Sequence, residues 1–146
     1  MTMSDYNHLL LAIDLSEHSD QVAAKARHIA DASNAKLSVI HVIEPISFSY
    51  GGDIPLDFTS IQEDIQAQAK TQLAKLGVEY GINEEDQYIM LGRPENEIHG
   101  LAEEIDANLI VVGSHGRHGL ALIFGSTANG VLHGAGCDVL AVRVKS

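Results

Sequence analysis

The chain has a single cysteine, Cys137, and no long apolar run. One thiol excludes an internal disulfide framework and a cysteine-rich zinc site, and it fits a reducing compartment, so we expect a cytoplasmic protein. No apolar stretch approaches the ~20 residues that cross a bilayer. The first basic residue is Lys25, so no basic n-region precedes Leu9–Leu11. The sequence therefore predicts neither a membrane span nor a secretory signal.

Basic side chains are scarce, with 9 Lys and Arg against 20 Asp and Glu and a formal net charge of −11. This charge argues against nucleic acid and against an anionic membrane as the main partner, because both require a broad basic face. The charge is uneven, since 19 of the 20 acidic residues but only 6 of the 9 basic ones lie in residues 1–106. Residues 107–146 are thus the only long stretch predicted to accept an anion.

The length of 146 residues, 45% of them hydrophobic, suits one globular domain spanning 1–146. Short apolar runs predict five buried strands, at 9–13, 37–43, 87–91, 109–112 and 139–144. Helical spacing of apolar residues fills the gaps between these strands. The alternating order βαβαβαβαβ predicts an α/β fold, a doubly wound, Rossmann-like parallel sheet with helices on both faces.

Each predicted helix has an apolar face that should point inward. Capping candidates Ser16 and Ser19 precede the first helix, and Pro94 suits the first turn of the third. The inward residues are Val22, Ala23, Ala26, Ile29 and Ala30; Ile61, Ile65, Ala69, Leu73 and Leu76; Ile98, Leu101, Ala102 and Ile105; and Ala128, Val131, Leu132 and Ala135. The second helix should begin at Thr59 or Ser60 and end near Gly77, after a long loop over 45–58.

A glycine-rich stretch follows the fourth predicted strand, at Gly113–Gly119, and Gly125-Ser126-Thr127 opens the next helix. Ligands of doubly wound sheets bind at the carboxyl ends of the strands. Glycines allow the backbone to approach a ligand, and a helix start with free N–H groups favours phosphate. The spacing is neither the GxGxxG fingerprint nor a P-loop. A surface loop followed by an ordinary helix cap is therefore an equal alternative on pattern alone.

Taken together, four segments resemble the universal stress protein family, over about residues 8–144. They are Ala12-Ile13-Asp14-Leu15-Ser16, His41-Val42, Gly92-Arg93-Pro94 with Ile98, and Gly113-Ser114-His115-Gly116 with Gly125-Ser126. The resemblance implies a five-stranded parallel sheet in the order 3-2-1-4-5, an ATP or related adenine-nucleotide site, and homodimers joined through the last strand.

The resemblance also implies which residues bind the nucleotide. Gly113, Gly116 and Gly125 to Thr127 would hold the phosphates and ribose, while Asp14 and its neighbours would line the adenine and ribose side, with Mg²⁺ possible between Asp14 and the phosphates. The full set is Ala12, Ile13, Asp14, Val42, Val112, Gly113, His115, Gly116, Arg117, Gly125, Ser126 and Thr127. Eight residues separate Gly116 from Gly125, whereas the ATP-binding members have nine.

Several of these conspicuous residues have a plain structural interpretation as well. Asp14 could instead cap the first helix, and Arg117 could lie in solvent. The histidines at 115, 118 and 133 lack the HxxxH or HExxH spacing of a metal site, so we expect no protein-bound metal. His41 suits a hydrogen-bonded core histidine, and Cys137, without a basic neighbour, suits a structural role.

The last predicted strand is apolar and lies at the sheet edge, where unpaired backbone groups favour association. Pairing with the same strand of a second copy would satisfy them through an isologous interface. Both the edge and the resemblance predict a homodimer. The expected interface residues are Val139, Ala141, Val142 and Val144.

The function favoured at this point is that of a cytoplasmic stress-response regulatory protein that binds ATP or a related adenine nucleotide. A dimeric stress protein that does not bind ATP is one alternative, based on the eight-residue spacing. A slow ATPase is another, with Asp14, His115 and Arg117 as candidate groups. No GxSxG elbow or P-loop lysine supplies a committed nucleophile or phosphate ligand, so we do not expect a dedicated enzyme.

Overall fold

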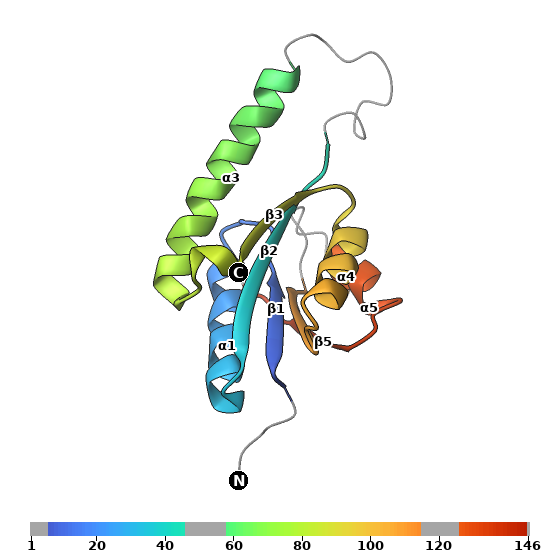
Figure 1. Ribbon diagram of the computed structural model, residues 1–146. Helices are drawn as coiled ribbons and strands as arrows, with labels where there is room; N and C mark the ends of the chain where they lie inside the picture. The colour runs from blue at the N-terminus through green and yellow to red at the C-terminus, as the bar shows by residue number, and fades with distance from the viewer. Residues whose placement is uncertain (1–5, 46–57, 115–125, 146) are drawn as a thin grey trace.

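The fold is an α/β sandwich around one parallel sheet (Figure 1). The computed structural model describes residues 6–45, 58–114 and 126–145. Its strands are β1 (His8–Ala12), β2 (Lys36–Ile43), β3 (Gln87–Leu91), β4 (Leu109–Gly113) and β5 (Asp138–Val142). Its helices are α1 (Ser19–Ser33), α3 (Phe58–Tyr80), the short 3-10 helix η1 (Glu84–Asp86), α4 (Pro94–Glu104) and α5 (Ser126–Leu132).

The five strands are all parallel and lie in the order β3-β2-β1-β4-β5, which confirms the predicted fold and strand order. β1 is central because both of its neighbours pair with it, and Leu9, Leu10 and Leu11 are fully buried. A continuous apolar run is what a strand covered on both faces requires. The strand order reverses between β1 and β4, so their carboxyl ends mark the ligand edge.

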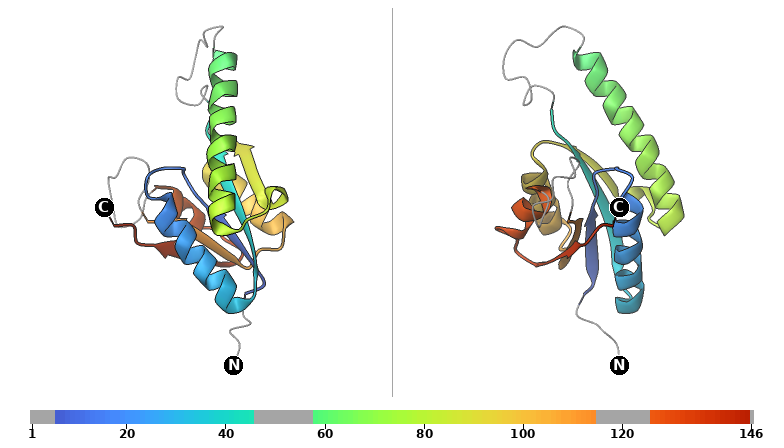
Figure 2. Two further views of the ribbon diagram at one scale, coloured as in Figure 1. Left: turned by 90° about the vertical axis from the view of Figure 1, so that its left-hand side faces the viewer. Right: turned by 180° about the vertical axis from the view of Figure 1, so that it is seen from behind.

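Helices lie on both faces of the sheet (Figure 2), and the core consists of two clusters of buried apolar residues, one on each face. α1 and α3 cover one face, where Val22, Ala26 and Leu73 pack on the odd residues of β1. α4 and α5 cover the other, where Ile98 and Val131 pack on Leu10 and Ile110. Helices on both faces confirm the doubly wound prediction. None of the described helices is both long and apolar enough to span a membrane.

The second helix departs from its prediction at both ends. Ile61 and Ile65 were expected to face inward, yet they are 44% and 39% exposed, because the first half of α3 extends beyond the sheet (Figure 1). Gly77 was expected to end the helix, yet α3 continues to Tyr80. Gly77 is buried, and a Cβ there would lie 2.8 Å from the Ile82 carbonyl oxygen and against Gln87 Nε2. Close packing, not helix termination, accounts for this glycine.

The last helix and last strand are shorter than predicted. α5 ends at Leu132, which is 44% exposed, and Gly134 has a left-handed φ of 85°, so Ala135 is not part of the helix. β5 ends at Val142, although Val144 remains buried. The N-cap of α1 is His18, with no side-chain cap bond, so neither Ser16 nor Ser19 is the capping residue.

Candidate functional site at the carboxyl edge of the sheet

The carboxyl ends of β1, β2 and β4 meet at one edge of the sheet. Ala12, Ile13 and Val112 are 7%, 8% and 2% exposed and belong to the core layers, so the edge is built on a rigid apolar base. Val42, on the next strand, is half-buried. Gly113 ends β4 and is half-buried beside them. The structure therefore brings together the predicted site residues of these three strands.

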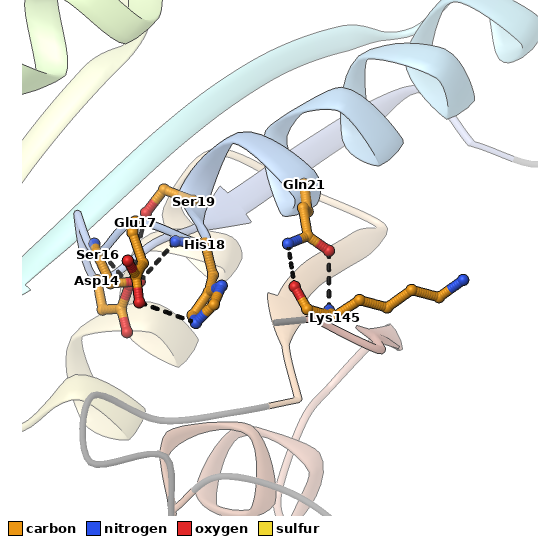
Figure 3. Close-up of polar contacts among 7 residues, drawn as sticks. All are labelled: Asp14, Ser16, Glu17, His18, Ser19, Gln21 and Lys145. Carbon is orange, nitrogen blue, oxygen red and sulfur yellow. Dashed lines mark hydrogen bonds and ion pairs between the residues drawn. The ribbon is translucent and has the colours of Figure 1, made fainter.

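Asp14 organises the turn between β1 and α1 (Figure 3). Its Oδ1 accepts hydrogen bonds from the Ser16 N–H at 3.0 Å and from the Ser19 hydroxyl at 3.5 Å. Ser16 Oγ in turn accepts from the His18 N–H at 3.3 Å. Asp14 therefore orders the entry to α1, but the N-cap is His18, so the alternative that Asp14 caps the helix is wrong. No described residue bonds to its second oxygen.

Leu15, directly after Asp14, has a left-handed φ of 57°. This conformation costs roughly 1–2 kcal/mol for a residue with a Cβ. Its side chain packs against the core layer under α1, which offsets that cost. The chain therefore reverses sharply at this point and holds the Asp14 carboxylate at the strand end. No local sequence pattern predicts this strained turn, because leucine is not a residue of left-handed turns.

His41 fixes the backbone next to Asp14. It is 5% exposed, and its Nδ1–H donates to the Ile13 carbonyl oxygen at 2.9 Å. The Ile13 N–H donates to the Ile40 carbonyl oxygen at 3.1 Å, so Ile13 is held through both of its backbone groups. His41 is a hydrogen-bonded core histidine, as predicted. Its contribution to the edge is rigidity.

Ser114 connects the end of β4 with the C-terminal segment. It is 6% exposed, and its N–H donates to the Val142 carbonyl oxygen at 2.8 Å. Its Oγ accepts from the Val144 N–H at 3.3 Å. The segment continues to Lys145, whose backbone N–H and C=O both bond to the Gln21 side chain (Figure 3). Sequence reasoning missed both roles, because tertiary contacts to a chain end leave no local pattern.

Four of the predicted nucleotide-binding residues, His115, Gly116, Arg117 and Gly125, lie outside the described residues. The backbone of Ser126 and Thr127 begins α5. α5 is fixed against α4 by His99, whose Nε2–H donates to the Val131 carbonyl oxygen at 2.7 Å. The site is therefore described on its strand side and at the start of α5, and the phosphate-loop assignment stays a prediction.

The remaining candidate groups are not activated for chemistry. Burial raises the pKa of the Cys137 thiol, and neighbouring Asp138 raises it further, which suits a structural cysteine. His133 is exposed and directly follows α5, at the end of the helix opposite to its start. In the described ranges, no cluster of three or more His, Cys, Asp or Glu could hold a metal ion.

The fold and this edge define a doubly wound α/β protein whose candidate ligand site lies where β1 and β4 end. The sequence model of the universal stress protein family matches residues 5–143. The chain therefore belongs to the universal stress protein family.

Relatives and solved structures agree with this assignment. The chain is 42% identical to universal stress protein A homolog 1 of Coxiella burnetii over 142 residues, which cover 96% of this chain and 98% of the relative. It is 37% identical to homolog 2 of the same organism, covering 98% and 99%. UspA from Lactobacillus plantarum has the same fold, with a TM-score of 0.79 at 21% identity and coverage of 96% and 98%. A universal stress protein solved in complex with cAMP gives a TM-score of 0.68 at 26% identity, covering 94% and 97%.

Proposed function

We propose that this universal stress protein is a cytoplasmic regulatory protein of the stress response that binds ATP or a related adenine nucleotide. The observation that carries the proposal is the juxtaposition of Asp14 with the end of β4 at the switch point of the sheet. Family membership and the glycines that follow β4 support it. The backbone N–H groups after Gly113 and at the start of α5 would bind phosphates.

The Asp14 carboxylate fits a ribose hydroxyl or a nucleotide-bound Mg²⁺. Within the described part of the chain, one of its oxygens is committed to Ser16 and Ser19, and the other has no bonding partner. A hard cation such as Mg²⁺ prefers carboxylate oxygens as ligands and also coordinates phosphate oxygens. Asp14 would hold the cation, and the cation would offset the negative charges of the Asp14 carboxylate and of the phosphates. The remaining nucleotide-binding positions are those carried over from the family.

Regulation by occupancy suits this site better than dedicated catalysis. Hydrolysis requires a group that positions water and a cation that stabilises the charge developing on the transferred phosphoryl. At the described edge, Asp14 is tied to the β1–α1 turn and His41 is buried against Ile13. Neither is a free general base. Slow ATP turnover is an alternative whose test is phosphate release that disappears in the Asp14→Ala protein.

A cyclic nucleotide is a second candidate ligand, because a structural neighbour at 26% identity was solved in complex with cAMP. It carries one phosphate charge and needs no metal ion. Binding of cAMP in preference to ATP would agree with a loop one residue shorter than in the ATP-binding members. A panel containing ATP, ADP, AMP and cAMP therefore distinguishes the two ligands.

The experiment is calorimetry with this panel, with and without Mg²⁺, on protein freed of bound ligand by denaturation and refolding. Chromatography of the released material identifies any nucleotide that copurified. We expect binding that Gly125→Val abolishes, because a branched side chain would stand where backbone meets phosphate. Gly100→Val is the matched control, since a Cβ at Gly100 contacts nothing within 4 Å. No heat with any nucleotide at high micromolar concentration would favour the scaffold that binds no nucleotide.

We also propose a homodimer paired through β5. β5 is an edge strand, and Val139 and Ala141 are half-buried. Val142 and Val144 are 8% and 5% exposed within the protomer, and both have main-chain bonds to Ser114, so the proposed interface keeps Val139 and Ala141 and not these two.

The dimer test follows from the strand geometry. Ser114 donates to the Val142 carbonyl, so the main-chain groups of Val142 face β4 and those of Ala141 face the open edge. Ala141→Pro should therefore give a monomer by light scattering, and Ala141→Ser, which keeps the N–H, should remain a dimer. A dimeric mass for the Ala141→Pro protein would exclude this interface.

A further inference from the structure

The segment after β5 is held in place on both sides of Arg143. The Val142 carbonyl oxygen accepts from the Ser114 N–H at 2.8 Å, and the Val144 N–H donates to Ser114 Oγ at 3.3 Å. Since Ser114 is buried at the end of β4, these two bonds fix the backbone of Arg143 beside the candidate site.

A second pair of hydrogen bonds holds the segment at Lys145, two residues after Arg143. Gln21 Nε2 donates to the Lys145 carbonyl oxygen at 2.6 Å, and the Lys145 N–H donates to Gln21 Oε1 at 2.9 Å (Figure 3). Gln21 lies in the first turn of α1, close to the turn that Asp14 organises. The C-terminal segment thus joins the two strand ends that form the site, and Arg143 lies between the anchors.

The direction of the Arg143 side chain follows from its neighbours. Val142 and Val144 both pack into the core layer under α1 and α3. Successive side chains of an extended chain point to opposite faces, so Arg143 points to the face covered by α4 and α5. It is exposed there, whereas Val139 and Ala141, on the same face, pack against the core.

The start of α5 lies at the same end of the sheet and on the same face. α5 connects the parallel strands β4 and β5, so it starts at their carboxyl ends. In register, Gly113 lies opposite Val142, which puts Arg143 next to the residue that follows Gly113. The backbone of Arg143 therefore lies at the end of the sheet where α5 starts.

Arg143 also has no carboxylate partner among the described residues, although the protein is strongly acidic. Arg27 and Lys36 pair with Asp31 and Asp86, at 2.8 and 3.2 Å. A guanidinium on a fixed backbone binds phosphate oxygens in a bidentate fork, which an ammonium cannot do. In a chain with a net charge of −11, such a cation would favour the binding of a polyanion at this edge.

We infer that Arg143 is a ligand-binding residue that contacts a phosphate group of the bound nucleotide. The inference rests on the proposed nucleotide function and assigns a phosphate contact outside the glycine loop, directly after the strand of the proposed dimer edge. Arg143 therefore contributes to phosphate recognition and not to recognition of the base.

The test compares Mg·ATP and adenosine, each by calorimetry, on the full chain. Arg143→Gln should weaken ATP binding about tenfold and leave adenosine unchanged, because only a charge-assisted phosphate contact is lost. The affinity of Arg143→Lys for ATP should lie between those of the parent protein and Arg143→Gln, since lysine keeps the charge and loses the bidentate fork. Lys145→Gln is the matched control: its backbone bonds to Gln21 remain, and its affinity for ATP should stay within about twofold of the parent protein.

The outcomes separate this inference from the function on which it rests. If the parent protein binds none of ATP, ADP, AMP, cAMP and adenosine, the proposed nucleotide function is wrong. If it binds ATP and Arg143→Gln binds ATP equally well, only the role of Arg143 is wrong. An equal loss of ATP and adenosine affinity would show a disturbed sheet edge and would also overturn the phosphate contact. A reduced salt dependence of ATP binding in Arg143→Gln, with an unchanged light-scattering mass, would support it.

Discussion

Gly77 in α3 and Gly100 in α4 should respond to alanine with opposite signs. In a helix interior, alanine is favoured over glycine by about 1 kcal/mol. Gly100 has no atom within 4 Å of a built Cβ, so Gly100→Ala should gain that stability. A Cβ added at Gly77 would lie 2.8 Å from the Ile82 carbonyl oxygen and against Gln87 Nε2, so it has no space.

The magnitude for Gly77→Ala is the balance of three effects. The helix gains about 1 kcal/mol from the propensity of alanine. Overpacking against a fixed backbone oxygen costs about 1–3 kcal/mol. Displacement of the Gln87 amide, which donates to the Ile82 carbonyl at 3.0 Å, costs about 1 kcal/mol more. We expect a net loss of about 2 kcal/mol.

Urea unfolding followed by circular dichroism measures both variants. With a slope of about 2 kcal/mol per M, the midpoint should fall by about 1 M for Gly77→Ala and rise by about 0.5 M for Gly100→Ala. All proteins are compared at one concentration, because dimerisation couples stability to concentration. A midpoint for Gly77→Ala equal to or above that of the parent protein would refute close packing at α3 as the reason for this glycine.

Two further predictions concern titratable groups away from the site. Burial lowers the pKa of His8, whose ring bonds to the Ile105 carbonyl and Ser38 Oγ. Because the unfolded chain binds this proton more readily, the stability of the protein should fall as the pH drops below about 6.5. Urea midpoints measured from pH 8 to 5 should fall less steeply in His8→Gln than in the parent protein. Because the pKa of Cys137 is raised, iodoacetamide at pH 7.5 should alkylate it more slowly than free cysteine, and the rate should reach that of free cysteine only in urea. A rate equal to that of free cysteine in the folded protein would contradict the structural role.

The resemblance and the apolar pattern together predicted most of the architecture before any coordinates. The runs at 9–13 and 109–112 became β1 and β4 because only buried parallel strands accommodate continuous apolar residues. The predicted core role of His41 was also correct, since a histidine inside an apolar run must find a backbone partner. The positions of Asp14 and Gly113 at strand ends followed from the same pattern.

Other features were not predictable from local pattern. Helical spacing makes Ile61 and Ile65 look the same as Leu73 and Leu76, and only the limited extent of the sheet decides which of them are covered. The left-handed Leu15 depends on packing that holds a strained backbone.

The sequence by itself determined the fold class, the strand order through the family, and the edge of the sheet where the proposed ligand site lies, because these depend on periodicity and on motifs. The tertiary structure alone decided how that edge is assembled. Ser114 and Gln21 bind the C-terminal segment across 30 and 124 residues of sequence, and such contacts place Arg143 beside the strand ends. Contacts this distant in sequence have no local signature, since they exist only once the parallel sheet has brought β1, β4 and β5 together.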